Sequence, residues 1–271
     1  MSNPNEKGVA LITGASSGIG AIYADRLARR GYDLILVARN AERLKKVAET
    51  VAVATGRKVE TLTADLNDRA DLARVEAVLR EDTRITALVN NAGVGAVAPL
   101  LKSDIDKMDD MIALNIVALT RLTYAAAPGF VARGGGTLIN ISSIAAIAPE
   151  MLNGVYGGTK AYVLTLGHSL QHELGDKGVR VQTVLPGATA TEFWDIAGFP
   201  HQNMPKAMVM SSEDMVDAAL AGLDQGERVT IPPLSDLDKW NTHEVARRAM
   251  SGHLSNETPA ERYGVGAVKA A

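Results

Sequence analysis

Tyr156 and Lys160 are the side chains in this sequence whose types and spacing best suit proton transfer. A separation of four residues places both on one face of a helix. A free tyrosine titrates near pH ~10, and a fixed ammonium beside it favours the phenolate and lowers that pKa. Such a phenol could exchange a proton with a carbonyl or alcohol oxygen. By itself the pair is weak evidence, because a tyrosine and a lysine often share an exposed helix face.

Ser143 follows residues 136–141, an apolar run that is typical of a buried strand. Ligands of open α/β sheets bind at the carboxyl ends of the strands. The Ser143 hydroxyl is therefore placed to hydrogen-bond a substrate oxygen. With Tyr156 and Lys160 it favours a site that protonates a carbonyl oxygen while a hydride reaches the carbon.

Residues 13–20 form a glycine-rich turn between an expected strand at 8–13 and a helix from about 19 to 30. Glycines let a backbone approach a pyrophosphate, whose charge is favoured at a helix N-terminus. The G-x-x-x-G-x-G spacing departs from the common G-x-G-x-x-G pattern, and an ordinary turn is the alternative. Residues 14–18 also match the nucleophile elbow of hydrolases around Ser16. That motif needs an earlier loop to supply its oxyanion hole, so we do not expect a serine hydrolase.

The expected second strand, 33–38, ends in Ala38 and is followed by Arg39. An acidic residue at this position would hold the ribose 2′-hydroxyl of NAD. Arginine instead matches a 2′-phosphate, because its planar fork pairs with phosphate oxygens. We therefore expect NADP(H) to be preferred over NAD(H), with Arg43 one helical turn on either assisting or facing solvent.

Strand-like and helix-like stretches alternate along the chain, which predicts an α/β fold: a single-domain, Rossmann-type, doubly wound parallel sheet of about seven strands with helices on both faces. The continuous apolar runs indicate strands covered on both faces. Residues 1–271 show no linker, although an irregular apolar segment at 188–210 interrupts the alternation. The small, polar tail from Ser255 is expected to be poorly ordered within a C-terminal extension at about 235–271. Further strands are expected at 58–64, 86–90 and 179–184, and further helices at 41–54, 69–80, 108–131 and 156–175.

Composition excludes several classes of function. The 271 residues carry a net charge of −3 without a basic stripe, which gives no reason to expect a nucleic-acid partner. The chain has no cysteine, which removes disulfides and thiolate chemistry and favours a cytoplasmic location. No apolar run reaches the roughly 18 residues that a membrane helix needs, and Met1–Lys7 lacks the apolar core of a signal peptide.

With these features in this order, the sequence resembles the short-chain dehydrogenase/reductase family over about residues 8–191. Ser143 is selected over Ser142 because the serine of this family lies thirteen residues before its tyrosine, and 156 − 143 = 13. Gly157 and Gly158 depart from the helix formers more usual after the tyrosine. The matching segments, in the order and spacing of the family, are Thr13–Gly20, Asp65–Leu66, Asn90–Gly93, Asn115, Ser143, Tyr156-x-x-x-Lys160 and Pro186–Gly187 with Thr191.

The resemblance implies that Tyr156 is the general acid or base and that Lys160 lowers its pKa and bonds the nicotinamide ribose. Ser143 would orient and polarise the carbonyl, and Asn115 would hold a water in a proton relay. It also implies a homotetramer or dimer in which the helices near 108–131 and 156–175 pack across subunits. The implied cofactor-binding residues are Gly14, Ser16, Ser17, Gly18, Ile19, Gly20, Arg39, Asp65, Leu66, Asn91, Ala92, Gly93, Tyr156, Lys160, Pro186, Gly187, Thr189 and Thr191.

Two of the three phenylalanines and one of the two tryptophans fall within Phe193–Phe199. This cluster is an apolar lid that excludes water from the substrate, a subunit contact, or ordinary packing. The lid hypothesis predicts a substrate with an apolar body. Its candidate substrate residues are Val94, Ile144, Leu152, Val155, Phe193 and Trp194.

The leading hypothesis is an NADP(H)-dependent carbonyl reductase or alcohol dehydrogenase, with a 3-oxoacyl thioester among the possible substrates. The alternative is a regulatory protein that binds the cofactor with little turnover, against which the complete set Asn115, Ser143, Tyr156 and Lys160 argues. His168 and His172 have the spacing of metal ligands. They lack an H-E-x-x-H pattern and an obvious third ligand, so we expect no metal site.

Overall fold

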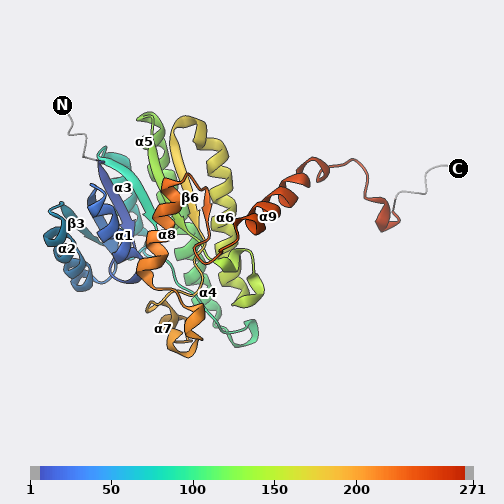
Figure 1. The fold of residues 1–271 in the computed structure, drawn as a ribbon, viewed down its shortest axis with the longest axis horizontal. Coiled ribbons are helices and arrows are strands. Elements are labelled where there is room, and N and C mark those ends of the chain that lie inside the picture. The colour runs from blue at the N-terminus through green and yellow to red at the C-terminus, as the bar shows by residue number, and fades with distance from the viewer. Residues whose placement is uncertain (1–6, 266–271) are drawn as a thin grey trace. The chain divides into compact units, whose positions relative to one another are not determined.

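A computed structural model describes residues 7–265, and within that range the chain forms a seven-stranded parallel sheet (Figure 1). The strand order is β3-β2-β1-β4-β5-β6-β7, so the winding direction reverses between β1 and β4. This confirms the predicted doubly wound Rossmann-type sheet. The strands are β1 (Val9–Thr13), β2 (Asp33–Ala38), β3 (Val59–Thr63), β4 (Ile85–Asn90), β5 (Gly136–Ile141), β6 (Val179–Val184) and β7 (Val229–Thr230).

Helices connect successive strands and cover the sheet. Between β4 and β5, residues Ile105–Ala132 form one continuous helix, whose middle part, Ala113–Ala118, is a π-helix. The α-helices are α1 (Gly18–Arg29), α2 (Ala41–Thr55), α3 (Arg69–Glu81), α4 (Ile105–Ile112), α5 (Leu119–Ala132), α6 (Gly154–Leu174), α7 (Phe193–Ala197), α8 (Ser212–Asp224) and α9 (Leu237–Ala249).

The sheet separates two hydrophobic cores because successive residues of a strand point to opposite faces. Ala10 and Ile12 of β1 pack with buried residues of α1, α2 and α8. Val9 and Leu11 pack on the other face with α3, α5 and α6. The two layers of helices hold the strands so that all their carboxyl ends meet at one edge.

The structure corrects several predicted elements. β3 is an edge strand, and three of its five residues are exposed, so it is not covered on both faces as expected. Residues 188–210 are not wholly irregular, because they contain α7 and two short 3-10 turns. The sequence pattern did not locate α8 or β7, and it placed the start of α6 at Tyr156, two residues late.

The chain divides into two compact units, Met1–Pro233 and Leu234–Ala271. The first holds the sheet. The second contains α9 and, among the described residues of the tail beyond Ser255, a 3-10 turn at Glu261–Tyr263. The signal-peptide expectation for the first residues and the end of the tail fall on residues 1–6 and 266–271, which lie outside the described residues.

One helix of the described chain, Ile105–Ala132, is long and apolar enough to cross a membrane by length and composition alone. The sequence expectation missed it because Asp110 and Arg121 interrupt its apolar residues. Half of its most apolar window is buried inside the protein. Leu122, Ala126 and Phe130 pack in the core beneath the sheet, and a core helix of this kind passes the same test.

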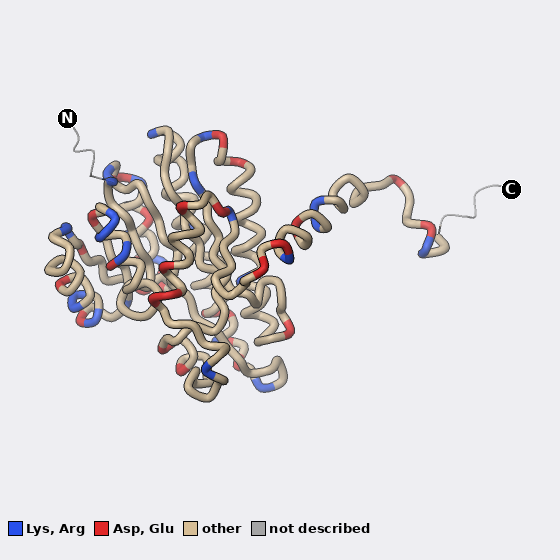
Figure 2. The backbone as a smooth tube through the Cα atoms, viewed as in Figure 1, with Lys and Arg blue, Asp and Glu red and all other residues tan. Residues whose placement is uncertain are grey.

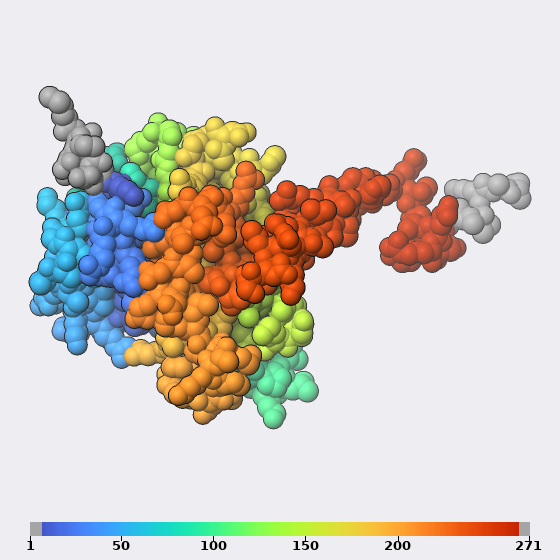
Figure 3. Space-filling view, viewed as in Figure 1, coloured from blue at the N-terminus to red at the C-terminus, as the bar shows by residue number. Residues whose placement is uncertain are grey.

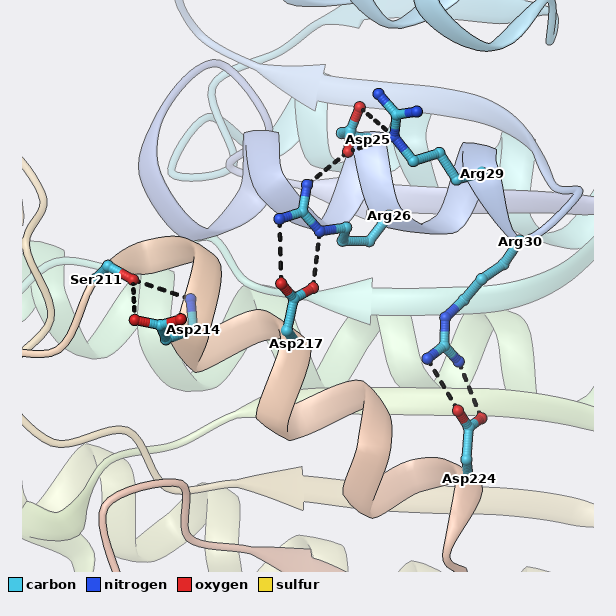
Figure 4. A network of polar contacts seen from close by, with 8 residues as sticks. All are labelled: Asp25, Arg26, Arg29, Arg30, Ser211, Asp214, Asp217 and Asp224. Atoms are coloured by element: carbon cyan, nitrogen blue, oxygen red, sulfur yellow. Dashed lines mark hydrogen bonds and ion pairs between the residues drawn. The ribbon is translucent and has the colours of Figure 1, made fainter.

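Ion pairs join α8 to α1 on the outside of the protein (Figure 4). Arg26 and Arg30 of α1 bond Asp217 and Asp224 of α8, at 2.7 Å and 2.9 Å. The surfaces of the two helices lie side by side in Figure 3, with α1 in blue and α8 in orange. Exposed pairs contribute little free energy each, roughly 0–1 kcal/mol. Their effect is positional, since α8 begins directly after residues 188–210 and anchors the end of that segment.

Acidic and basic residues are interspersed along the described backbone in Figure 2, with no basic stripe on either unit. Many of them are paired locally, as Arg84 is with Asp82 and with Glu60. This pattern is typical of a solvated surface rather than of an electrostatic footprint for nucleic acid.

Two glycines of α6 provide a matched test of its packing on β6. A Cβ at Gly167 would lie 2.0 Å from Thr183 Oγ1, whereas one at Gly158 meets nothing within 4 Å. We expect Gly167→Ala to lower the free energy of unfolding by about 1–3 kcal/mol through overpacking. Gly158→Ala should raise it by about 0.5–1 kcal/mol, because alanine loses less backbone entropy in a helix. Denaturant unfolding measures both, and equal effects would contradict this packing.

Candidate active site

The turn after β1 is held against the end of β4 by a group of short hydrogen bonds. Thr13 Oγ1 accepts from the backbone N–H groups of Asn91 and Ala92, each at 3.0 Å. Asn91 Nδ2 donates to the carbonyl oxygens of Thr13 and Gly14, at 2.9 Å and 3.2 Å. A Cβ at Gly20 would lie 2.3 Å from Gly14 O, so this close approach requires glycine. The glycines therefore allow the ends of β1 and β4 and the start of α1 to pack closely together.

The N-terminus of α1 is suited to an anion. Its N-cap residue, Ser17, makes no side-chain cap hydrogen bond, and its first turn has no acidic residue. Six other helices begin with a side-chain cap, as α3 does at Asp68 and α6 at Asn153. The free N–H groups of α1 and its dipole would stabilise a phosphate. The residues present thus fit the pyrophosphate of a dinucleotide.

Arg39 lies at the end of the same groove beyond β2, with 66% of its side chain exposed. Its guanidinium is 3.8 Å from the Asp65 carboxylate, which leaves most of its donors available. Arg43 bonds Glu192 at 2.6 Å, linking α2 to the start of α7. One cavity is lined by the glycine turn and by the side chains of Arg39, Arg43, Asp65 and Glu192. The structure therefore brings Arg39 to the position that the sequence predicted.

Ser143, Tyr156 and Lys160 meet at the end of β5. The Ser143 hydroxyl hydrogen-bonds the Tyr156 side chain. Lys160 Nζ donates to Ile141 O at 3.0 Å and lies 5.7 Å from the centre of the Tyr156 ring. Ser142 Oγ donates to Lys160 O at 2.7 Å. The start of α6 is therefore fastened to Ile141 and Ser142, directly before Ser143, which holds Lys160 close to the other two side chains.

The electrostatics of this cluster differ from the prediction. Burial raises the pKa of Tyr156 to about 12, and the hydrogen bond from Ser143 offsets only part of that rise. Burial also lowers the pKa of Lys160 to about 8. The net pKa of Tyr156 in the cofactor-free site is thus raised, and the expectation that Lys160 lowers it stays a prediction. Excluding water disfavours the phenolate more than its neighbours favour it, and the sequence argument considered charge without burial.

Asn115 lies in the π-helical turn, a distortion often found at functional sites. Its Oδ1 accepts from Val94 N–H at 3.0 Å, and its Nδ2 donates to Val94 O at 2.9 Å and to Thr159 Oγ1 at 3.1 Å. The side chain therefore fastens the Val94 segment to α6, and its role in a water relay stays a prediction. Thr159, buried between Tyr156 and Lys160, was missed because only the fold brings it to Asn115.

One cavity of about 670 Å³ runs from Arg39 to the side chains at the end of β5. Of the predicted residues, Gly20, Asn115 and Val155 do not line it. Val155 instead packs beside Tyr156 in a small apolar cluster, because it points to the other side of α6. Sequence reasoning missed Val97 and Met151 as lining residues, and nothing in their local pattern marks them. The apolar part of the cavity near Tyr156 is lined by Val94, Val97, Ile144, Met151, Leu152, Phe193, Trp194, Ile196, Phe199, Met204 and Met208.

The sequence profile of the short chain dehydrogenase family matches residues 8–197. This chain belongs to that family. The match covers the turn, the Ser143–Tyr156–Lys160 cluster and the first part of the apolar segment, so the predicted family and its oxidoreductase class are confirmed.

Known members resemble this dehydrogenase over most of its length. A short-chain dehydrogenase from Sphingobium yanoikuyae in complex with NADPH is 46% identical, with a TM-score of 0.92 over 94% of this chain and 99% of its own. The bulky-bulky ketone specific alcohol dehydrogenase from Comamonas testosteroni is 43% identical, with a TM-score of 0.87 over 94% and 98%. The very-long-chain 3-oxoacyl-CoA reductase of Anas platyrhynchos is 36% identical over 69% of this chain. The match spans 62% of that relative's length.

The buried ammonium of Lys160 makes the stability of this dehydrogenase depend on pH. We expect Lys160→Met to raise the free energy of unfolding at pH 7 by about 1–2 kcal/mol, because an uncompensated charge leaves the interior. From pH 8 to 10.5 the folded lysine is neutral while the unfolded one keeps its proton, so the wild type gains stability and this difference shrinks. Thermal unfolding of the cofactor-free protein across pH 7–10.5 measures it. Exposed Lys177→Met is the control, and a difference independent of pH would contradict the burial.

Proposed function

We propose that this chain is an NADP(H)-dependent oxidoreductase that interconverts ketones carrying bulky apolar groups and the corresponding secondary alcohols. The observation that carries the proposal is the position of Ser143, Tyr156 and Lys160. They lie in a single cavity of about 670 Å³ that has an arginine-bearing groove at one end and an apolar wall at the other.

In the direction of reduction, Tyr156 Oη gives its proton to the carbonyl oxygen as the carbon is reduced. The nicotinamide, when bound, supplies the hydride. A pKa of about 12 keeps the phenol protonated at neutral pH, as a proton donor requires. The Ser143 hydroxyl donates to the same carbonyl oxygen and holds it against Tyr156. Lys160 remains largely charged below pH 8, so its ammonium stabilises the phenolate that forms when the proton leaves.

The cofactor assignment rests on Arg39. The groove there has an exposed guanidinium after β2 where an NAD-binding protein would place a carboxylate. The relative from Sphingobium yanoikuyae, which binds NADPH, supports the same choice. The 2′-phosphate would pair with Arg39, the pyrophosphate with the uncapped end of α1, and the nicotinamide ribose with Lys160.

The substrate class rests on the apolar wall of the cavity. Aliphatic, aromatic and methionine side chains from four separate segments surround the space in front of Tyr156. The likeness to the bulky-bulky ketone specific enzyme of Comamonas testosteroni supports a ketone with large groups on both sides. A 3-oxoacyl thioester is the second candidate, favoured by the likeness to the Anas platyrhynchos reductase.

The proposal includes a cytoplasmic homo-oligomer, a dimer or tetramer, with no nucleic-acid or membrane partner. The lack of cysteine and the dispersed charges support the location and the absence of a nucleic-acid partner. Ile112, Val117 and Tyr124 are exposed along Ile105–Ala132, the helix expected to pack across subunits. These apolar side chains are exposed in the single chain, which supports a contact between this helix and another subunit.

Removing the phenol tests the mechanism. We expect Tyr156→Phe to lower kcat for ketone reduction by at least about 100-fold, because general acid catalysis contributes about 10²–10⁴-fold. Affinity for NADPH should change less than about threefold, since the ring and its packing remain. NADPH oxidation is followed with a panel of bulky ketones, aldehydes and 3-oxoacyl thioesters. Undiminished activity would refute the assigned role, and NADPH binding without turnover of any substrate would favour the regulatory alternative.

Removing the guanidinium tests the cofactor. We expect Arg39→Ala to weaken NADPH binding by about 10–100-fold, the effect of losing charge-assisted hydrogen bonds to a phosphate. NADH binding should change by no more than about threefold, because NADH lacks the 2′-phosphate. Fluorescence titration of the reduced coenzymes gives both dissociation constants. Arg39→Lys should lie between wild type and Arg39→Ala, and equal losses for the two coenzymes would exclude a contact between Arg39 and the 2′-phosphate.

A further inference from the structure

Gly95 and Phe193 approach more closely than any other side chain at position 95 would allow. An added Cβ on Gly95 would lie 2.2 Å from Phe193 Cζ, 2.9 Å from Cε2 and 3.1 Å from Cε1. Gly95 is not among the glycines with a positive φ, so its backbone conformation suits other residues. The ring of Phe193, and not the backbone, is therefore what requires glycine at this position.

The Phe193 ring also packs against the catalytic tyrosine. The centroids of the Phe193 and Tyr156 rings are 5.8 Å apart at an angle of 51°. Trp194 meets Phe193 edge-on at 5.4 Å, and its Nε1 donates to Thr189 O at 3.0 Å. Phe193 is thus packed among Gly95, Tyr156 and a buried tryptophan that is itself anchored, which is a defined position rather than a loose surface contact.

The segment that carries Gly95 cannot easily withdraw from the ring. Val94, next in the chain, is bound through both its backbone N–H and its carbonyl oxygen to Asn115. Val97 N–H donates to Ala197 O at 3.4 Å, which joins the segment directly to α7. In Figure 1, α7 lies at the same end of the sheet as α4. A side chain added at Gly95 would therefore displace the Phe193 ring rather than its own backbone.

We propose that Gly95 is the seat for Phe193, by which we mean the position against which the Phe193 ring packs. We propose further that this pair determines the size of the group that a ketone can place beside Tyr156. The Phe193 ring, packed on Gly95, holds residues 188–210 against the Val94–Val97 segment and forms part of the cavity wall beside the phenol. Gly95 lies outside the cavity lining and acts through Phe193, so it is a positioning residue. The inference rests on the proposed function, because it concerns the substrate of that same site.

A double-mutant cycle tests the seat. We expect Gly95→Ala to lower kcat/KM with a bulky ketone by about tenfold or more, because the displaced ring spoils the alignment of the carbonyl with Tyr156. Phe193→Ala should shift relative kcat/KM toward ketones with a larger second group. In the Phe193→Ala background, Gly95→Ala should change kcat/KM by less than about twofold, since the added methyl then meets no ring. If Gly95→Ala lowered kcat/KM by the same factor with and without Phe193→Ala, the two residues would act independently and the proposal would be overturned.

The matched control is Gly175→Ala at the end of α6. Gly175 has a φ of −57°, and a Cβ there meets nothing within 4 Å. We expect wild-type kcat/KM and an unchanged order of preference across a series of ketones graded in size. If Gly95→Ala resembled this control, Phe193 would not be seated on Gly95.

A readout without turnover separates this inference from the proposed function. The chain has two tryptophans, so Trp240→Phe leaves Trp194, 8% exposed, as the only fluorophore of this kind. We expect Gly95→Ala to increase acrylamide quenching of Trp194, and to add nothing in the Phe193→Ala background. Unchanged quenching in Gly95→Ala would refute the seat. A wild-type protein that reduces no ketone would refute the proposed function, while the quenching result would still decide the contact.

Discussion

The carboxyl ends of β1 and β4 are joined where Thr13 and the segment after Asn90 share their hydrogen bonds. The crossover direction of the sheet reverses between these two strands, which opens a crevice at that edge. The glycine turn, the uncapped start of α1 and the segment that reaches Gly95 all leave from this junction. If the strand ends moved apart, the phosphate end and the proton-transfer end of the cavity would no longer be held in a fixed position relative to each other.

Burial gives the proton-transfer group its character. Tyr156 and Lys160 are both nearly inaccessible, and burial favours the neutral form of each, although the two pKa values move in opposite directions. A protonated phenol and a lysine that titrates close to neutrality form a pair in which small electrostatic changes decide where the proton lies. The fold can hold such a pair because Ile141 O, at the end of β5, accepts a hydrogen bond from Lys160 Nζ, and Ser142 Oγ donates one to Lys160 O.

The apolar end of the cavity is built differently from the cofactor end. At the cofactor end, backbone and short polar side chains set the distances. At the apolar end, rings and methionines pack against one another, and a missing side chain at Gly95 matters as much as the side chains that are present. Ion pairs between α1 and α8 and between Arg43 and Glu192 anchor residues 188–210 near both ends. The segment is thereby linked to both the groove and the carbonyl position.

The sequence by itself determined the alternation of strands and helices, the glycine turn, and the identities of Ser143, Tyr156, Lys160 and Arg39. The elements and the glycine turn follow from local spacing and from apolar runs, whose physical causes lie within a few residues. The choice of Ser143 over Ser142 came from the resemblance to the family. Tertiary structure alone decided that β3 is an exposed edge, that Val155 turns away from the cavity, and that Asn115 is engaged by Val94 and Thr159. It also decided the direction of the Tyr156 pKa and the seat at Gly95. Burial and close contact depend on residues distant in the chain, and no local pattern records which of them will meet.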